Sequence, residues 1–535
     1  MAKEVRNKLI GNIPSLHHEH SSYKWWVLAN IMVGTFMAVL DATVVNVALN
    51  KMMTSFGTSV DKIEWVLTAY LLVFAVMLPT SGWVADHFGY KRTYFFALFL
   101  FTLGSFLCSL SWSEDALIGF RLVQGAGAGF LMPVGMAIIT REFPPEKRGI
   151  ALGFWGIAAA ASVSLGPMVG GYLVDNFSWQ SIFDVNVPVG IVAMAATYLI
   201  QREYKTEKAR SFDFVGFISM SVFLTFLLLA LSNGNSSWNT NGWSSDFILT
   251  CFGLSIIGLV VFLATDLSIK HPLIELSLLK DFNFSVTNGI LFIFGMGLFG
   301  STFLLPLFLQ SSLNYTALQS GLVFFPVGVL QAIMSPISGI MSDKINPKVP
   351  AFLGVVLLAI GLFLQSNLSL FSEHAQIMGA LYVRGLGMGM LFTPLSTIAL
   401  MKIPRVKMAQ ASGLFNVIRQ IGGSFGVAIF GTMLTRRMLY HTAVNGEVVN
   451  QYSAAYRNIQ YQMQNFVQQT TGGNGSAVTA KAKALIGQHI TGQAFVQAIN
   501  DDFYLAGAIT LLCLLPILLL RTKKKKNVEH VAIME

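Results

Sequence analysis

Five ionisable side chains lie inside long apolar stretches of the sequence, where a charge is costly. They are Asp41, Arg121, Asp184, Arg384 and Arg419. Even on a lenient insertion scale, a charge at the centre of a bilayer costs about 2.5–3.5 kcal/mol, so such residues usually face a cavity and serve a function. Desolvation favours the protonated form of a buried carboxyl group, and an approaching arginine favours its charged form. We therefore expect Asp41, Arg121 and Asp184 to couple proton binding to a movement.

Two simpler roles for the carboxylates stay open. Asp41 and Asp184 could each form a permanent ion pair that only joins two helices, and Asp184 lies close to the end of its apolar stretch. Arg121 keeps its proton at any ordinary pH. Its role must therefore be to bias a carboxylate or to bind an anion.

Aromatic and methionine side chains in the same stretches suit a cavity for large apolar cations. The residues that we assign to a substrate cavity are Phe36, Trp65, Tyr70, Met388 and Met390, together with Arg384 and Arg419. Most aromatic side chains in such a chain face lipid or neighbouring helices, and this is the alternative for each of them.

The composition identifies the class of protein that carries these residues. Of the 535 residues, 54% are hydrophobic and only 11% are charged, and the mean hydropathy is +0.62. A soluble core of this size would need far more surface charge, so we expect an all-α polytopic membrane protein. All three cysteines lie in apolar stretches and predict no disulfide framework. We expect no metal site.

Apolar stretches of about 20 residues are long enough to cross the hydrocarbon core as helices. The sequence contains fourteen: 25–49, 63–83, 93–112, 116–139, 149–174, 181–200, 213–231, 246–267, 285–309, 319–341, 350–368, 375–400, 408–434 and 503–521. Loops after the even-numbered spans hold sixteen Lys and Arg residues, whereas the short loops on the other side hold Lys51 and Lys62. The positive-inside rule therefore places both termini in the cytoplasm.

The first and second halves of the chain contain the same sequence pattern. The segment Gly82–Asp86 after the second span recurs as Gly339–Asp343 after the tenth (343 − 86 = 257). Arg121, followed by a glycine-rich run, recurs as Arg384 (384 − 121 = 263). Offsets this similar predict two halves of six spans each, with two further spans inserted between them.

The domain boundaries follow from this repeat. We expect a cytoplasmic tail (1–24), a first six-helix bundle (25–200), a linker with two extra spans (201–280), a second six-helix bundle (281–434 and 503–521), an extracytoplasmic helical hairpin (435–502) and a basic cytoplasmic tail (522–535). In the hairpin, the positions Tyr452, Tyr456, Ile459, Met463 and Phe466 follow a 4-3-4-3 spacing, which predicts a helix with a narrow apolar seam. This hairpin either packs on itself or docks a partner.

The loop after the second span is expected to form a conformational latch. Asp86 can cap a helix N-terminus and pair with a nearby basic residue, which would stabilise one conformation. The latch residues are Gly82, Asp86, Gly89, Lys91 and Arg92, with Asp343 as the counterpart in the second half. A simple topology anchor is the alternative.

The apolar stretch 156–173 combines glycines with an interior proline. In a bilayer, small residues let helices approach closely, and proline bends a helix. We therefore assign a hinge to Gly156, Gly166, Pro167, Gly170 and Gly171. We expect this stretch to meet its counterpart, 408–434, across the interface between the halves. Ordinary small-residue packing is the alternative.

Together these motifs resemble the major facilitator superfamily, specifically its fourteen-span drug:proton antiporter branch (EmrB/QacA type, EmrB-like subgroup). The resemblance covers nearly the whole chain and lies in the segments 40–49 (LDATVVNVAL), 82–92, 117–129 (LIGFRLVQGAGAG) and 156–171. It implies the major facilitator fold, with roles in proton coupling for Asp41 and in proton transfer for Arg121. Asp184 is an acid that the family pattern does not require, so it is either a second proton site or a recognition site for cationic substrates.

The resemblance also implies a function. It implies a multi-pass protein of the bacterial inner membrane that exports amphipathic drugs or other toxic compounds by proton-coupled antiport, and that is not an enzyme. No GxxxxGK[ST] motif occurs, so we expect no ATP site and no cofactor besides the proton gradient. The long loop 435–502 resembles that of the EmrB-like subgroup, which implies a periplasmic adaptor and an outer-membrane channel as partners. The net charge of +9 is spread through the loops, so we expect no nucleic-acid partner. The alternatives are an exporter of one metabolite, such as a fatty acid or siderophore, and a non-transporting scaffold or receptor.

Overall fold

The computed structural model describes residues 22–205, 211–236, 238–269, 272–404, 407–448, 454–471 and 475–521. Every regular element in these ranges is a helix, and fourteen helices are long and apolar enough to span a membrane. The predicted all-α fold and its number of spans are confirmed. The predicted tails lie outside the described residues, except for 22–24 of the first tail.

The described helices follow the predicted order of spans. The first group is α2 (Tyr23–Phe56), α3 (Val60–Ile63), α4 (Trp65–Phe88), α5 (Tyr90–Ser109), α6 (Glu114–Glu142), α7 (Arg148–Asn176), α8 (Ser181–Asp184) and α9 (Asn186–Ile200). Two inserted spans follow, α10 (Phe214–Asn233) and α11 (Asp246–Ser268). The last group is α12 (Phe282–Ser311), α13 (Ala317–Lys344), α14 (Lys348–Gln365), α15 (His374–Leu400), α16 (Met408–Val448), α17 (Ala454–Thr471), α18 (Gly475–Leu512) and α19 (Leu514–Leu519).

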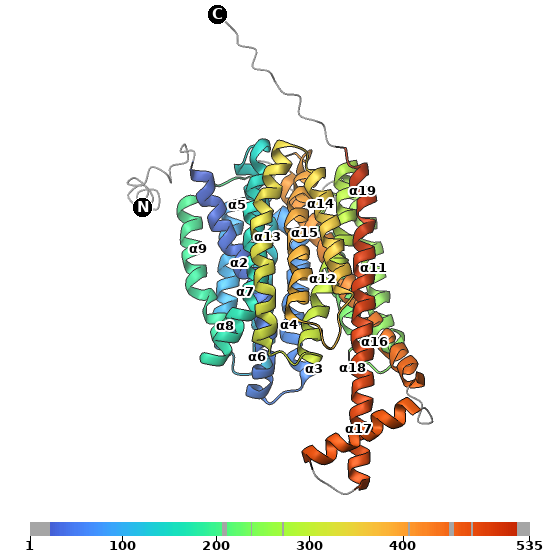
Figure 1. The fold of residues 1–535 in the computed structure, drawn as a ribbon. Coiled ribbons are helices and arrows are strands. Elements are labelled where there is room, and N and C mark those ends of the chain that lie inside the picture. Colours follow the sequence, from blue (N-terminus) through green and yellow to red (C-terminus); the bar gives the residue numbers. More distant parts are fainter. Residues whose placement is uncertain are drawn as a thin grey trace, which may run out of the picture.

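The spans lie side by side in one bundle, and α2 begins on the side where α19 ends (Figure 1). A helix satisfies its own backbone hydrogen bonds, which is why apolar stretches of this length become helices where no water is present. Polar residues mark several helix starts: the side chains of Ser113, Asp213, Ser245, Asp281 and Thr316 each accept a hydrogen bond from the first helical turn.

The most extensive contacts between the halves are not the predicted one. The predicted contact between 156–173 and 408–434 is wrong, because α7 packs along α13, and α16 packs against α4. A Cβ on Gly153 would lie 2.7 Å from the carbonyl oxygen of Ser335, and one on Gly82 would lie 2.9 Å from the Cα of Gln410. Glycine at these positions therefore allows the backbones of the two halves to touch.

The glycines assigned to the hinge face two different neighbours. A Cβ on Gly166 or Gly170 would meet Thr43 or Val44 of α2, which belongs to the same half. Gly156 and Gly171 instead face α13. Helix α7 thus lies between its own bundle and the opposite half, with small residues on both contact surfaces.

The inserted helices α10 and α11 pack on each other, and α10 also contacts both α4 and α16. A Cβ on Gly258 of α11 would lie 2.7 Å from the backbone nitrogen of Phe223, so these two spans are closely joined. They therefore form a helical pair beside the junction between α4 and α16.

Helices α16 and α18 continue beyond the bundle and carry α17 at their far end (Figure 1). Arg437 and His441 of α16 both contact Asp501 of α18, at 2.5 Å and 2.8 Å. Helix α17 packs on α18 through an apolar cluster of Met463, Val467, Val478 and Ala482. The predicted seam is only partly involved, because Ile459 and Phe466 are exposed and Tyr452 lies outside the described residues.

We expect the substitution Gly153→Val to lower the free energy of unfolding by about 1–3 kcal/mol, because the added methyl groups overpack the junction between α7 and α13. The measurement is the thermal unfolding of the detergent-solubilised protein. Gly253→Val is the matched control, since a Cβ at Gly253 of α11 would meet no atom within 4 Å. An equal midpoint for both variants would contradict the close approach.

Candidate functional site

A buried polar network in the first half brings Asp41 and Arg121 together. Asp41 comes from the middle of α2, and Arg121 and Gln124 lie one turn apart on α6, so their side chains share one helix face. Glycines let the neighbouring helices approach: a Cβ on Gly104 would lie 2.6 Å from the Cα of Gln124, and one on Gly125 would lie 2.7 Å from the carbonyl oxygen of Tyr70. Close helix packing thus closes the site.

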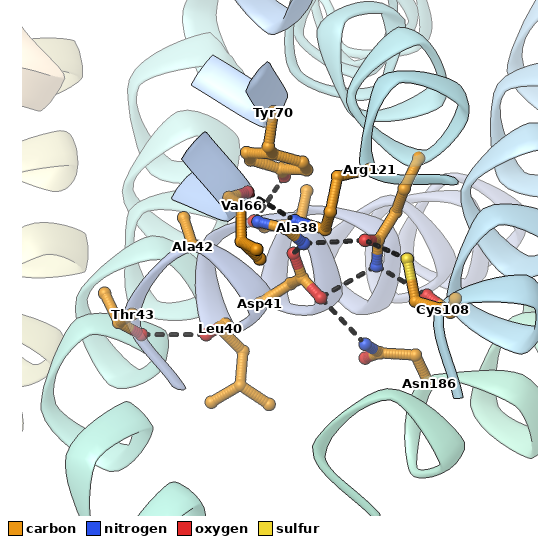
Figure 2. A network of polar contacts seen from close by, with 12 residues as sticks. Ala38, Leu40, Asp41, Ala42, Thr43, Val66, Tyr70, Cys108, Arg121 and Asn186 are labelled. Atoms are coloured by element: carbon orange, nitrogen blue, oxygen red, sulfur yellow. Dashed lines mark hydrogen bonds and ion pairs between the residues drawn. The ribbon is translucent and has the colours of Figure 1, made fainter. Parts of the chain in front are cut away.

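The carboxylate of Asp41 forms an ion pair with the Nη1 of Arg121, and their side chains are 1% and 0% exposed. Figure 2 shows both side chains within one ring of polar contacts. The Nε of Arg121 also donates to the carbonyl oxygen of Val66, at 3.1 Å. A pair this deeply buried has its charge balanced internally, because neither partner can be hydrated.

Amides hold this carboxylate in place. The Nε2 of Gln124 donates to the Oδ1 of Asp41 at 2.7 Å and to the Oγ of Ser105 at 2.6 Å. The Oε1 of Gln124 accepts from Arg121 at 2.6 Å. Asn186, at the start of α9, donates to the same Oδ1 at 3.3 Å. Gln124 therefore contacts both charges and fixes their geometry.

An aromatic side chain covers the arginine. The guanidinium carbon of Arg121 lies 4.1 Å from the centre of the Tyr70 ring, a cation–π distance. The Tyr70 hydroxyl donates to the carbonyl oxygen of Ala38, at 3.0 Å. The Nη2 of Arg121 is buried without a hydrogen-bond partner among the described residues. Arg121 thus depends on Asp41 for its counter-charge.

Sequence reasoning missed the neutral members of the network. Gln124, Asn186 and Ser105 are each no more than 2% exposed and complete the contacts of Asp41. The spacing of Gln124 three residues after Arg121 was the available signal. The structure does not bring Asp184 to this site: its side chain is exposed at the end of α8.

The predicted latch residue Asp343 contacts the opposite half. Its two carboxylate oxygens accept hydrogen bonds from the backbone N–H groups of Gly149 and Ile150, at 3.0 Å and 2.9 Å. These are orphan donors in the first turn of α7, where the helix dipole favours a negative charge. The contact joins α13 to α7 at one end of the bundle.

Asp86 lies in a different arrangement at the end of α4. Its Oδ1 accepts a hydrogen bond from the hydroxyl of Tyr90 at 2.9 Å, and Arg141 of α6 donates to that hydroxyl at 3.1 Å. Gly82, one turn earlier, faces Gln410 of α16. Asp86 is therefore linked to a cation through Tyr90.

Gly89, Lys91 and Arg92 meet a carboxylate that sequence reasoning did not select. The backbone N–H groups of Lys91 and Arg92 donate to Glu203, at 3.1 Å and 3.3 Å. Gly89 has a φ of +100°, which favours glycine. Burial raises the pKa of Glu203, and its hydrogen bonds to Lys91 and Arg92 act in the opposite direction.

The residues assigned to a substrate cavity do not form one cluster. Tyr70 belongs to the Asp41 network, Trp65 is 41% exposed at the start of α4, and Phe36 is partly buried. Met388 and Met390 lie on α15, where Met390 is buried and Met388 partly buried. An apolar groove of about 400 Å³ lies elsewhere, between α7 and α13, and Ile157, Leu165, Phe325 and Ile333 are among its lining residues.

Arg384 and Arg419, also assigned to the cavity, have different surroundings. Arg384 is 1% exposed and donates to the Oγ1 of Thr302 at 2.7 Å. Arg419 is partly buried, and its Nη2 lies 3.9 Å from the thioether sulfur of Met132. Met132 is on α6 and Arg419 on α16, so this contact crosses from one half to the other.

Comparison with known proteins identifies the family of this chain and several similar proteins. A model of the Major Facilitator Superfamily matches residues 31–427. The chain is 31% identical over 481 residues to the multidrug export protein EmrB of Haemophilus influenzae, covering 89% of this chain and 91% of that protein. It is 30% identical over 494 residues to the fatty acid resistance protein FarB of Neisseria gonorrhoeae, covering 92% and 95%.

A solved structure shares the fold. The proton:xylose symporter XylE matches with a TM-score of 0.59 over 92% of this chain and 95% of that chain, at 14% sequence identity. At this identity the likeness concerns the arrangement of helices alone.

We expect Gln124→Leu to lower the free energy of unfolding by about 1–3 kcal/mol, because Asp41 and Ser105 would lose a buried hydrogen-bond partner. Asn186→Leu removes a single long contact and should cost less. Chemical or thermal unfolding in detergent, with both variants side by side, measures the difference. A Gln124→Leu protein as stable as the unchanged chain would argue against the network.

Proposed function

The chain belongs to the major facilitator superfamily, and from this premise we propose that it is a proton-coupled antiporter that exports amphipathic drugs or other toxic compounds by alternating access. As a member of this family it is a multi-pass membrane transporter and not an enzyme. The buried ion pair of Asp41 and Arg121 is the observation that carries the proposal.

The pair supplies a physical link between a proton and a movement. When Asp41 takes up a proton, Arg121 loses its counter-charge in a site from which water is excluded. Removing one partner of a buried pair costs about 3–5 kcal/mol. A bias of about 5.5 kcal/mol moves a two-state equilibrium from 1:99 to 99:1. Protonation of Asp41 is therefore of the right magnitude to drive α2 and α6 into a second arrangement.

The latch contacts distinguish two conformations, one in which they are formed and one in which they are broken. Asp343 holds the start of α7 through two backbone hydrogen bonds, and Gly82 brings α4 against α16. Both contacts join the halves at the end predicted to be cytoplasmic, so a state that opens toward the cytoplasm must break them. The opposite opening preserves them.

The proton gradient supplies the energy. A potential of about 100 mV yields about 2.3 kcal/mol for each charge that crosses the membrane, which exceeds the 1.4 kcal/mol of a tenfold concentration ratio. No cofactor is required for this exchange.

Export of many compounds and export of one metabolite are the two forms of this function. The relative named multidrug export protein favours the first, and the relative named fatty acid resistance protein favours the second. A resistance panel in a drug-sensitive host separates them: broad export predicts resistance to several unrelated compounds, and a single substrate predicts resistance to one. Unchanged sensitivity and the absence of any flux would instead favour a scaffold.

We also propose that α17 and the far part of α18 dock a periplasmic adaptor that leads to an outer-membrane channel. Two exposed apolar side chains, Ile459 and Phe466, lie two turns apart on one face of α17 and are not part of the cluster that packs on α18. An aromatic, apolar patch of this kind is typical of protein interaction surfaces.

We expect Asp41→Asn to abolish proton-driven export, because the amide can neither bind nor release the proton. The measurement is the flux of a fluorescent amphipathic dye in proteoliposomes with an imposed pH gradient. Asp246→Asn, an exposed position in the first turn of α11, is the matched control and should keep full flux. Undiminished transport by Asp41→Asn would refute the coupling role.

We expect deletion of 454–485 to spare dye flux in proteoliposomes and to abolish resistance in an intact two-membrane cell. The deletion removes α17 but leaves the contacts of Arg437 with Asp501 and of Asn445 with Gln497. Equal loss in both measurements would mean that the segment is structural. Full resistance in the cell would contradict the docking role.

A further inference from the structure

The membrane interior of the second half contains two arginines that lack an acidic partner. Arg384 donates to the Oγ1 of Thr302 at 2.7 Å and to the Oε1 of Gln365 at 3.3 Å, and both acceptors are neutral. The Nε of Arg419 is buried without a hydrogen-bond partner among the residues that the structure describes. Within the parts of the chain that the structure describes, neither arginine forms an ion pair.

The internal repeat allows the partners of the equivalent arginines in the two halves to be compared. Arg384 is the counterpart of Arg121 (384 − 121 = 263), and Thr302 lies at nearly the same offset from Asp41 (302 − 41 = 261). In each half the arginine contacts this position on the first helix of its bundle. The second half thus keeps the arginine and has a hydroxyl where the first half has a carboxylate.

No carboxylate elsewhere in these spans replaces the missing charge. The segments 282–342, 349–372, 374–434 and 503–521 contain no Asp or Glu. Asp501 of α18, just before the predicted span 503–521, pairs with Arg437. Asp502 is buried, and the charged groups that act on it are Asp501 and Arg437. Two positive charges are therefore uncompensated where charge is costly.

Arg419 is the one of the two that lies between the halves. Its guanidinium carbon is 5.3 Å from the centre of the Phe392 ring, and its Nη2 faces Met132 of the opposite half. Phe392 in turn contacts Trp155 and Phe415, with ring centres 5.9 Å apart in both cases. The guanidinium of Arg419 thus lies against an aromatic ring and a thioether at the junction of the two bundles.

We infer that Arg419 is the receptor for an anionic headgroup, and that the compounds exported by this protein include amphipathic carboxylates. This inference rests on the proposed export function and names part of its substrate class. A guanidinium pairs with a carboxylate through two parallel hydrogen bonds, and the surrounding rings and methionine accept an apolar tail. The same charge repels the apolar cations that the aromatic residues alone suggest.

Equilibrium binding to the purified full-length protein in detergent tests the inference. The probes are decanoate and the uncharged decanol, at about pH 8, where a carboxylate of ordinary pKa is ionised. We expect Arg419→Gln to weaken decanoate binding by at least about tenfold, the loss of one charge-assisted hydrogen bond, and to change decanol binding by less than about twofold. Arg419→Lys should lie between.

Arg436→Gln is the matched control, because Arg436 is exposed on the same helix. It should bind both probes as the unchanged protein does. Unaltered decanoate affinity in Arg419→Gln, or an equal loss for both probes, would overturn the inference. Retained decanol binding also shows that the variant is folded. The measurement uses no gradient, so a failure of dye export in wild-type proteoliposomes would overturn the proposed function separately.

Discussion

An arginine that keeps its proton inside a membrane needs a counter-charge. In this protein the two halves differ in whether they supply one. Arg121 has Asp41 beside it, whereas the described surroundings of Arg384 and Arg419 offer hydroxyl, amide, thioether and aromatic groups. In the first half the charges of Asp41 and Arg121 therefore balance each other until Asp41 binds a proton. In the second half, a bound anion would balance the charge of Arg419. On this view the two bundles divide the work of an exchanger between them.

The remaining structure keeps these charges away from water while allowing the bundles to move. Glycines along α7, α13 and α4 bring backbones of the two halves into contact. Polar contacts also join the halves, and those of Asp343 with the start of α7 are the clearest of them. Close backbone contact together with breakable hydrogen bonds suits a junction that opens and closes repeatedly.

The sequence predicts this architecture well where the physical signal is strong. Charges in apolar spans identified Asp41 and Arg121, because hydrocarbon makes them costly. Gln124 and Asn186 were missed, since neutral amides in a span carry no comparable penalty. The partner of α7 was predicted wrongly for another reason: an internal repeat reveals which helices are equivalent, and equivalent helices need not touch.

The hairpin was predicted as a helix pair, but the seam on α17 could not be placed from its own periodicity. Its packing depends on Val478 and Ala482, which belong to the next helix, α18. Contacts between elements are decided by both surfaces, and a single sequence reveals only which residues are apolar.

Helix α18 runs without interruption from the projecting hairpin into the membrane bundle. Its 38 residues form a rod about 57 Å long. A rod of this length works as a lever: a tilt of about 10° at its membrane end displaces the other end by about 10 Å. Rocking of the second bundle would thus displace the hairpin at the other end of α18. This displacement would occur once in each transport cycle.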